Sequence, residues 1–527
     1  MNTQKQVPTI SAKYVGEPLD LYERVRRGRA ANTLLLESAD ITTHAGTQSL
    51  ILADASLRVS CRGRRVSVEA LDANGAAAFA PLRAALADVP AEAESPATLV
   101  FAFPPIDPEQ DEETRLRARS PLDVLRALRE TFSPRDDAER FLLGGIFGYD
   151  LVEVFEKLPA VAEGANTCPD FLFYLAETAV KINHVARSTE IFSLALGDDA
   201  EELERIRART EALAAACDAF VPAGVPAVSE SARQPTETLP VSLGKSDKTY
   251  CAEVEYLKTF IRKGDIFQVV PSRSFSAPCP NPEAAYRALK KSNPSPYMFY
   301  VDDREFTVFG ASPEISVKFT AATRLVELYP IAGTRRRGFN ADGTINCDLD
   351  SRVEFGLRMD TKELSEHLML VDLARNDLAR IAKPNTRRTS ELLKVDRYSH
   401  VMHLVSHVVA ELRDDLDALH AYLACMNMGT LTGAPKIRAT ELLREVERER
   451  RGSYGGAVGW LGGNGDMDTC ILIRSAFVRN GVATVQAGGG VVLDSVPQSE
   501  ADESRNKAMA PLVAVAQAQG KVLTFNG

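Results

Sequence analysis

Two short acidic stretches, far apart in the chain, each carry a pair of glutamates three residues apart. Glu363 and Glu366 form the first pair, and Glu500 and Glu503 form the second. Side chains at this spacing are neighbours on one face of a helix. Carboxylate oxygens are the ligands that Mg2+ and Mn2+ favour, so two such helices facing each other could hold one divalent cation. Charged runs are more often solvated helix faces, and the spacing leaves open whether the two pairs meet.

Each glutamate pair needs a helix to present it. Leu364, Leu368 and Val371 recur at helical spacing beside the first pair and are predicted to face a core. In the second stretch, Ser499 with Asp502 three residues later resembles a capping box and predicts a helix start there.

The second helix continues with two informative residues. Lys507 falls on the same face as Glu500 and Glu503. Pro511, about one turn later, is predicted to kink or end the helix, because proline lacks the backbone N–H that the helix needs. The metal face lies before this point and is expected to survive.

Glycine-rich turns offer groups that could bind a carboxylate. Gly488, Gly489 and Gly490 follow the strand-like run 482–486, and glycines let backbone N–H groups approach a ligand closely. A tight turn explains the triplet about as well. Gly333 and Thr334 end another strand-like run, where a glycine and a hydroxyl could hold a carboxylate. The three arginines that follow, 335–337, are equally typical of an exposed loop.

Isolated polar residues in apolar surroundings are further candidates. Tyr454 and Arg474 each stand in an otherwise apolar strand-like run, and a buried arginine needs an anionic partner. His403 is either a residue on a helix surface or a proton-transfer group, for which the titration range of imidazole is suited. The segment 429–436, with Thr430 and Pro435, indicates a turn into a helix whose start could attract an anion.

Composition excludes several classes of protein. The 527 residues carry a net charge of -10, which argues against a nucleic-acid or anionic-membrane binder. No apolar run reaches the length of about 18 residues that a membrane-spanning helix requires. Eight cysteines lie scattered without paired spacing, which favours neither a zinc site nor a disulfide framework. Because residues 1–8 lack the apolar stretch of a secretory signal, we expect a cytoplasmic protein with reduced cysteines.

The chain divides into three segments of different texture. Residues 1–219 contain short strand-like pieces and charged helical stretches such as 200–216. Residues 220–245 are rich in proline, serine and threonine and are typical of an exposed connector, whereas residues 246–527 mix strands, helices and the polar motifs. No regular strand–helix alternation with a phosphate-binding loop is present. We therefore predict an α+β fold with mostly antiparallel β-sheets, packed as a sandwich with surrounding helices.

These pieces, in this order, resemble the chorismate-utilising enzymes, which include anthranilate, aminodeoxychorismate, isochorismate and salicylate synthases. Each motif alone is weakly specific, but nine of them in order over residues 260–510 are very specific. The matching segments are 266–273, 310–314, 330–334, 362–367, 371–377, 429–436, 451–456, 486–490 and 500–503.

Two positions within this family indicate the nucleophile. Relatives that use water resemble one another in carrying a lysine where this chain has Gln268, and aminodeoxychorismate synthases carry a nucleophilic lysine where it has Ala332. The pattern is similar to the large, chorismate-binding subunit of anthranilate synthases. Gly489, where relatives often have alanine, and Thr432, where serine is common, are mild departures.

The resemblance implies a Mg2+-dependent conversion of chorismate and ammonia to anthranilate and pyruvate through aminodeoxyisochorismate. The metal would be held by the four glutamates 363, 366, 500 and 503. Glu314 would protonate the leaving hydroxyl, Gln268 would line the ammonia approach, and His403 would assist removal of the C2 proton. The other residues that the resemblance assigns to the site are Thr430 and the substrate-binding residues Gly333, Thr334, Tyr454, Arg474, Gly488, Gly489, Gly490 and Lys507.

The resemblance also implies partners. No cysteine sits in the elbow of a glutamine amidotransferase, so ammonia would come from a separate amidotransferase subunit in a hetero-oligomer. The N-terminal half resembles the tryptophan-sensing region of enteric-type forms, which implies feedback inhibition by L-tryptophan. A buried strand end is the plain alternative for the motif at 34–38. The implied tryptophan-binding residues are Leu36, Glu37, Ser38, Pro296, Tyr297 and Met298.

Two other functions remain open at this stage. An aminodeoxyisochorismate synthase would stop before pyruvate is lost, and its product would not be aromatic. A non-catalytic tryptophan-binding regulator would have lost the metal site. The presence of all four glutamates and of His403 argues against the regulator.

Overall fold

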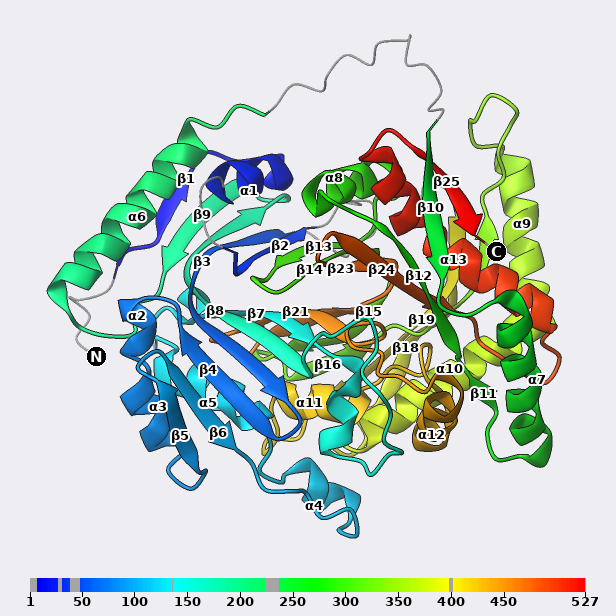
Figure 1. Cartoon of the computed structure of the whole chain (residues 1–527), viewed down its shortest axis with the longest axis horizontal. Coiled ribbons are helices and arrows are strands. Elements are labelled where there is room, and N and C mark those ends of the chain that lie inside the picture. Colours follow the sequence, from blue (N-terminus) through cyan, green and yellow to red (C-terminus); the bar gives the residue numbers. More distant parts are fainter. Residues whose placement is uncertain are drawn as a thin grey trace.

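The structure, a computed structural model, describes residues 7–26, 31–37, 48–134, 136–222, 237–397 and 401–526. Strands far apart in the sequence join one hydrogen-bonded network that closes on itself, with mostly antiparallel neighbours and helices on its outside (Figure 1). One pairing, between β10 and β25, is parallel. The predicted α+β fold with mostly antiparallel sheets and surrounding helices is confirmed. Among the described residues, no helix is both long and apolar enough to cross a membrane.

The strands of the network range from 3 residues in β1 to 15 residues in β3. Their bounds are β1 (Ile10–Ala12), β2 (Thr33–Glu37), β3 (Gln48–Arg62), β4 (Arg65–Ala70), β5 (Ala91–Ser95), β6 (Thr98–Ala102), β7 (Leu142–Phe147), β8 (Phe171–Asn183), β9 (Ser188–Ser193), β10 (Thr238–Leu243), β12 (Ser272–Pro278), β13 (Tyr297–Asp302), β14 (Thr307–Ser312), β15 (Ile315–Thr320), β16 (Leu325–Leu328), β17 (Ile331–Arg336), β18 (Arg388–Arg397), β19 (Val401–Glu411), β21 (Ala457–Gly462), β22 (Met467–Ile471), β23 (Ser475–Arg479), β24 (Val482–Gly488) and β25 (Val522–Asn526). A separate two-stranded sheet pairs β11 (Gln268–Val269) with β20 (Gly433–Ala434).

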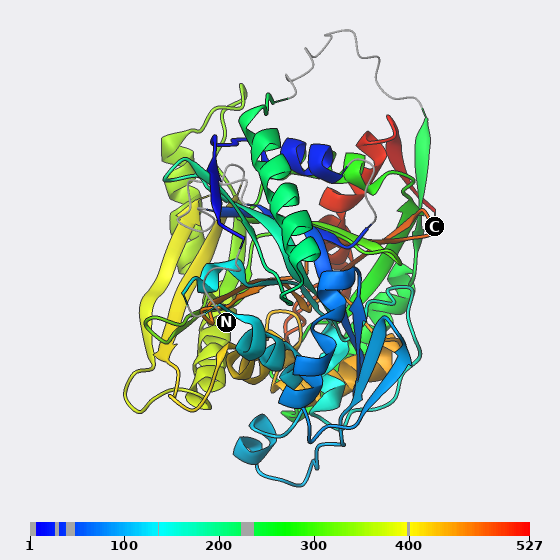
Figure 2. The ribbon, with the colours of Figure 1, turned by 90° about the vertical axis from the view of Figure 1, so that its left-hand side faces the viewer.

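The helices pack on the outside of this network. They are α1 (Pro18–Arg26), α2 (Ala73–Ala76), α3 (Phe79–Ala85), α4 (Glu112–Leu116), α5 (Leu122–Phe132), α6 (Ala200–Asp218), α7 (Asp247–Lys263), α8 (Pro282–Ser292), α9 (Cys347–Met359), α10 (Thr361–Ala379), α11 (Ala418–Cys425), α12 (Lys436–Glu447) and α13 (Pro497–Gln517), with short 3-10 turns at Ala138–Arg140 and Tyr149–Val154. The helix α6 lies against β1, β8 and β9 (Figure 2).

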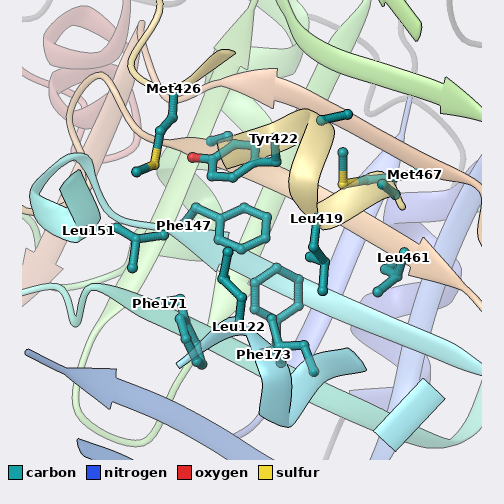
Figure 3. Close-up of a cluster of buried hydrophobic side chains, with 14 of the residues drawn as sticks. Leu122, Phe147, Leu151, Phe171, Phe173, Leu419, Tyr422, Met426, Leu461 and Met467 are labelled. Atoms are coloured by element: carbon teal, nitrogen blue, oxygen red, sulfur yellow. The ribbon is translucent and has the colours of Figure 1, made fainter. Parts of the chain in front are cut away.

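The two halves of the chain interleave in the sheet. The strand β2 pairs with β13, so that Glu37 lies opposite Met298, and β7 pairs with β21. Below these strands, the ring of Phe147 from β7 stacks on Tyr422 from α11 with 4.0 Å between ring centroids (Figure 3). Buried aromatic pairs of this kind add to the hydrophobic stabilisation that joins the halves. The division at 219 and 246 stays a prediction about the sequence segments.

The described part of the predicted connector is more structured than expected. Its residues 238–243 form β10, which pairs with β12 and β25. The buried positions of β10 alternate with exposed ones, because successive side chains of a strand point to opposite sides. The proline-rich texture of the whole segment concealed this short strand.

Four local predictions differ from the structure. The helix α13 starts at Pro497 and not at Ser499, because proline fits the first turn, and the helix continues through Pro511 to Gln517. Pro511 is buried on the face that also buries Leu512, so packing offsets the lost hydrogen bond. Leu368 is exposed, and His403 lies on the strand β19 and not on a helix.

Candidate functional site

The two predicted acidic helices converge on the glycine turn that follows β24. Gly489 stands so close to α13 that an added Cβ would lie 2.6 Å from Oε2 of Glu500. A Cβ on Gly490 would lie 3.1 Å from Oε1 of Glu366, which α10 supplies. Carboxylates from both helices therefore flank the same three-residue turn, and a larger residue there would have to displace their side chains.

The charges of these carboxylates act on one another. Burial, followed by the negative charges of Glu363 and Glu503, raises the pKa of Glu366 to about 6. Burial and the charge of Glu503 also raise the pKa of Glu500. Carboxylates that repel one another in a shielded site favour a bound cation. The four side chains therefore lie in one electrostatic neighbourhood, as the metal prediction requires.

Two of the four carboxylates form ion pairs within the protein, whereas a third has an oxygen without a hydrogen-bond partner. Glu363 accepts a hydrogen bond of 2.8 Å from Nη1 of Arg335, and Nζ of Lys507 lies 2.6 Å from Oε1 of Glu503. Oε2 of Glu500, by contrast, is buried without a hydrogen-bond partner. A buried carboxylate oxygen without a partner is costly unless it meets a cation or water. The donor set of carboxylate oxygens fits a hard cation such as Mg2+.

The oxygens of these four carboxylates lie farther apart than those of another acidic group. In the described residues, the acidic group whose oxygens all lie within 4.8 Å of one another is Asp72, Glu177 and Glu202. Arg205 pairs with all three of these residues. Arg205 therefore compensates part of the charge of this second group, which lies outside the predicted site.

The candidate acid, Glu314, sits in the turn between β14 and β15. Thr430 donates a hydrogen bond of 2.9 Å from Oγ1 to Oε1 of Glu314. Burial raises the pKa of Glu314 to about 7, although Thr430 and the charges of Lys507 and Arg474 partly oppose the shift. A carboxyl group with this pKa is partly protonated at neutral pH and can donate a proton.

The candidate base, His403, faces the strand that carries Thr334. Nδ1 of His403 lies 2.8 Å from Oγ1 of Thr334 on the neighbouring strand β17. Burial, together with the positive charge of Arg474, lowers the pKa of His403 to about 4. The imidazole is therefore neutral at physiological pH and can accept a proton.

A short stretch of β17 joins the two parts of the site. The register between β17 and β19 shifts at Gly333, which has a φ of 82°. An added Cβ there would lie 3.2 Å from Oε2 of Glu363. Gly333 and Thr334 therefore bridge the acidic helix α10 and the base His403.

Cationic groups are placed for an anionic ligand. Arg474 lies in the bend between β22 and β23, and in the part of the chain that the structure describes no carboxylate lies within ion-pair distance of it. Its charge acts on Tyr454 and Glu314. Lys507 reaches the glycine turn, where Nζ donates to the carbonyl oxygen of Gly488 at 3.1 Å. Arg474 is thus a half-buried cation that a carboxylate ligand would satisfy.

Gln268 closes the site from the opposite side. Its Nε2 donates to Oε1 of Glu366 at 3.0 Å, whereas its Oε1 is buried without a partner. The side chain also lies against Gly490, where a Cβ would meet Nε2 at 2.3 Å. The structure thus brings Gln268 and all the predicted metal, acid, base and carboxylate-binding residues to one place.

The predicted tryptophan residues lie in a different place. Leu36, Glu37, Pro296, Tyr297 and Met298 line a cavity of about 870 Å³ between the strands. Glu37 accepts hydrogen bonds of 2.7 Å from Tyr286 and from Lys290. The walls of the cavity also include Val458 and Trp460. Ser38, the remaining predicted residue, lies outside the described residues.

Three ion pairs near the site were missed by sequence reasoning. Arg335, for which an exposed loop was one of two interpretations, pairs with Glu363 and Asp360. Lys436 pairs with the buried Asp377 at 2.7 Å and ties the turn at 429–435 to α10. Lys436 and Asp377 each belong to one of the matched motifs, and their joint occurrence was the signal for this ion pair that the sequence offered. The spacing of the two motifs could not show that the side chains are in contact.

Comparison with known proteins places the chain in a well-defined group. Residues 94–513 match the family described as chorismate binding enzyme. The chain is 53% identical over 529 residues to "Anthranilate synthase component 1" of Escherichia coli, with 100% of both chains covered. It is 53% identical to the protein of the same name from Salmonella typhimurium, with 98% of each chain covered. The crystal structure of anthranilate synthase component I from Streptococcus pneumoniae superposes with a TM-score of 0.69 and 29% identity, over 88% of this chain and 92% of that one.

Proposed function

The chain belongs to the anthranilate synthase component 1 family of chorismate-binding enzymes, and from this premise we propose that it converts chorismate and ammonia to anthranilate and pyruvate. One observation carries the proposal most directly. Glu314 and His403 lie in one site, and the pKa of the acid is raised to about 7 whereas that of the base is lowered to about 4. When the surroundings of two neighbouring titratable groups shift their pKa values in opposite directions, the two groups are suited to act as acid and base in the same reaction.

In the first step, Glu314 acts as the general acid. Ammonia attacks C2 of the chorismate ring, the ring double bond shifts, and the C4 hydroxyl leaves as water with the proton that Glu314 donates. Thr430 holds the carboxyl group in place through its hydrogen bond. Gln268 lines the approach of ammonia, because its free Oε1 can accept a hydrogen bond from an N–H group. The product of this step is aminodeoxyisochorismate.

In the second step, His403 assists removal of the C2 proton. The C2 hydrogen leaves as the enolpyruvyl oxygen departs, so that pyruvate is released and the ring becomes aromatic. Thr334 orients the imidazole through its contact with Nδ1. We expect a His403→Met variant to retain amination and to accumulate aminodeoxyisochorismate, detected by chromatography of the reaction mixture. Full anthranilate formation by this variant would remove His403 from the role.

The carboxylate groups of the substrate have separate partners. Thr334, Gly488, Gly489, Gly490 and Lys507 would hold the ring carboxylate, and Tyr454 and Arg474 would hold the enolpyruvyl carboxylate. The absence of a carboxylate partner for Arg474 among the described residues supports this second assignment. A half-buried cation such as Arg474 stabilises a bound carboxylate through a charge-assisted hydrogen bond.

Glu363, Glu366, Glu500 and Glu503 would hold Mg2+. The fit rests on the free Oε2 of Glu500 and on the two glycines that leave room beside it. When bound, the ion would supply positive charge at the ring carboxylate. Glu363 would have to exchange its present partner Arg335 for the ion.

We also propose that a separate amidotransferase subunit supplies the ammonia, so that the working enzyme is a hetero-oligomer in the cytoplasm. The eight cysteines are all free, in accord with a reducing compartment. L-tryptophan would bind in the cavity lined by Glu37 and Met298, and it would inhibit by favouring one of two conformations. The free amino group of the inhibitor could pair with a carboxylate such as Glu37.

The direct test is incubation of the pure chain with chorismate, ammonium and Mg2+, followed by anthranilate fluorescence, with and without tryptophan. We expect fluorescence that requires Mg2+ and falls when tryptophan is added. Consumption of chorismate without an aromatic product would instead identify an aminodeoxyisochorismate synthase, the alternative that the relatives do not favour. No chorismate consumption would refute the proposal.

A further inference from the structure

One buried arginine holds the helix that carries Glu500 and Glu503. Arg273 lies on β12 and is 2% exposed. Its Nη2 donates to the carbonyl oxygen of Ala501 at 2.8 Å, and its Nε donates to Oγ of Ser504 at 2.9 Å. Ala501 and Ser504 each directly follow one of the two glutamates in α13. Because a helix rises only about 1.5 Å per residue, the guanidinium group contacts α13 at the levels from which both carboxylates extend.

The contact between Arg273 and α13 is a closed hydrogen-bond network. Oγ of Ser504 also donates to the carbonyl oxygen of Ala501 at 2.7 Å, so the two acceptors are joined to each other as well as to the guanidinium group. Both residues are fully buried. The planar guanidinium group presents its N–H groups in a fixed fork, which the single ammonium group of lysine cannot reproduce. Two contacts at different points fix the rotation of α13 about its axis as well as its distance from β12.

The other side of the guanidinium group is anchored at the start of α7. Nη1 donates to Oδ1 of Asp247 at 2.6 Å and to the carbonyl oxygen of Lys245 at 3.3 Å. The guanidinium carbon lies 5.0 Å from the ring centroid of Tyr250 and 5.3 Å from that of Phe275. A guanidinium group with a paired charge and two aromatic neighbours has a defined orientation. Arg273 is therefore a rigid support for α13.

The backbone of Arg273 belongs to the sheet that ends in the glycine turn. In the ladder between β12 and β24, Arg273 lies opposite Ala487, the residue before Gly488. The turn passes so close to α13 that a Cβ on Gly489 would lie 2.6 Å from Oε2 of Glu500. Arg273 thus joins the turn through strand pairing and α13 through its side chain, and it sets the spacing between these two parts of the site.

We propose that Arg273 is a positioning residue for the divalent cation, because it fixes the place of Glu500 and Glu503. The inference rests on the proposed function, in which these glutamates bind Mg2+. Mg2+ requires nearly ideal octahedral geometry, so a small rotation of α13 would weaken its binding. Groups that orient metal ligands without touching the ion contribute to metal affinity in this way.

Variants of the full chain separate this role from a general effect on stability. Arg273→Lys keeps the charge but loses the fork, and Ser504→Ala removes one acceptor with little change in volume. The control Arg58→Lys removes a buried arginine of β3, whose Nε and Nη2 donate to Asp303 at 2.8 and 3.1 Å, outside the site. The dissociation constant of Mg2+ is measured by calorimetry, the Tm by thermal unfolding, and kcat by anthranilate formation from ammonium.

We expect Arg273→Lys to bind Mg2+ about 10- to 100-fold more weakly, the usual cost of losing a group that orients metal ligands. Ser504→Ala should weaken binding by roughly 5-fold, because one hydrogen bond is lost. At saturating Mg2+, kcat of either variant should stay within about threefold of that of the unmodified chain, because excess ion fills the site. Arg58→Lys should lower the Tm and change the dissociation constant of Mg2+ by less than about twofold.

A double variant shows whether Arg273 acts through Ser504. If it does, Arg273→Lys with Ser504→Ala should bind Mg2+ within about twofold of Arg273→Lys alone, since the shared contact is already lost. Ser504→Ala keeps the test decisive if Arg273→Lys does not fold. An unchanged dissociation constant in the Arg273 and Ser504 variants, or an equal change in Arg58→Lys, would overturn the positioning role alone. If the unmodified chain itself binds no Mg2+, the metal assignment in the proposed function fails, and the positioning role fails with it.

Discussion

The candidate active site and the cavity proposed for tryptophan differ in how their polar groups are paired. In the candidate active site, Oε2 of Glu500 and Oε1 of Gln268 are buried without hydrogen-bond partners, and Arg474 forms no ion pair with a carboxylate among the described residues. In the cavity, the carboxylate of Glu37 is satisfied by Tyr286 and Lys290. A site that transforms an anion keeps its polar groups unpaired at a cost in stability, whereas a site that senses a ligand can be stable without it.

The two sites also differ in how far their residues are apart in the sequence. The cavity depends on the pairing of β2 with β13, which joins residues near 37 to residues near 298. The candidate active site is built within residues 268–507 and depends on two helices that meet at a glycine turn. A change in the cavity should therefore alter regulation, and a change in the candidate active site should alter the reaction.

The largest expected effect is on the acid. A Glu314→Gln variant keeps the hydrogen bond to Thr430 but has no proton to donate, so kcat for amination should fall by about 10²- to 10⁴-fold. Chorismate consumption with saturating ammonium measures the effect. The control Glu190→Gln, on the distant strand β9, should leave kcat unchanged. If Glu314→Gln retained full activity, Glu314 would not be the general acid, and the contrast between the two sites would no longer be supported.

The next effect concerns the metal. A Glu500→Gln variant removes the unpartnered carboxylate, and the Mg2+ concentration for half-maximal activity should rise by about 10- to 100-fold. Titration of activity with MgCl2 measures this, and calorimetric titration of Mg2+ gives a readout that does not need turnover. Asp502→Asn, on an exposed position of the same helix, is the matched control. Equal Mg2+ dependence in both variants would contradict the metal assignment.

The pH profile sharpens the comparison further. Glu314 must be protonated and His403 neutral, and their pKa values are about 7 and about 4. The rate should therefore rise as pH increases through about 4 and fall about tenfold per pH unit well above 7. A Thr430→Val variant removes a hydrogen bond that lowers the pKa of Glu314, so its falling limb should move to higher pH. A falling limb that Thr430→Val leaves in place would assign that limb to another group.

The smallest effect is expected in the cavity. A Met298→Thr variant removes apolar contact from the wall, and the tryptophan concentration for half inhibition should rise by roughly 10-fold. Activity without tryptophan should change by less than about twofold. Val301→Thr, buried on the same strand outside the cavity wall, controls for loss of stability. Comparable loss of inhibition in both variants would mean that the strand, and not the cavity, transmits the effect.

Local patterns predicted the elements that carry these sites. Composition and periodicity indicated a strand-like piece at 33–36, a helical stretch at 200–216 and a strand-like run at 482–486, where the structure has β2, α6 and β24. These predictions agree with the structure because strand and helix patterns depend on residues only a few positions apart in the sequence. The extra turn of α13 before Ser499 and its passage through Pro511 were missed, because tertiary packing overrides local helix signals.

The sequence by itself determined which residues could do chemistry, since side-chain type and motif order do not depend on the fold. Only the tertiary structure decided the protonation and the ion pairing of these residues. The pKa of Glu314 near 7 requires burial, the pairing of Glu363 with Arg335 requires β17 beside α10, and the hydrogen bond from Gln268 to Glu366 requires β11 beside α10. Desolvation and charge pairing act through space, and distances through space are set by the packing of segments that are remote in the chain.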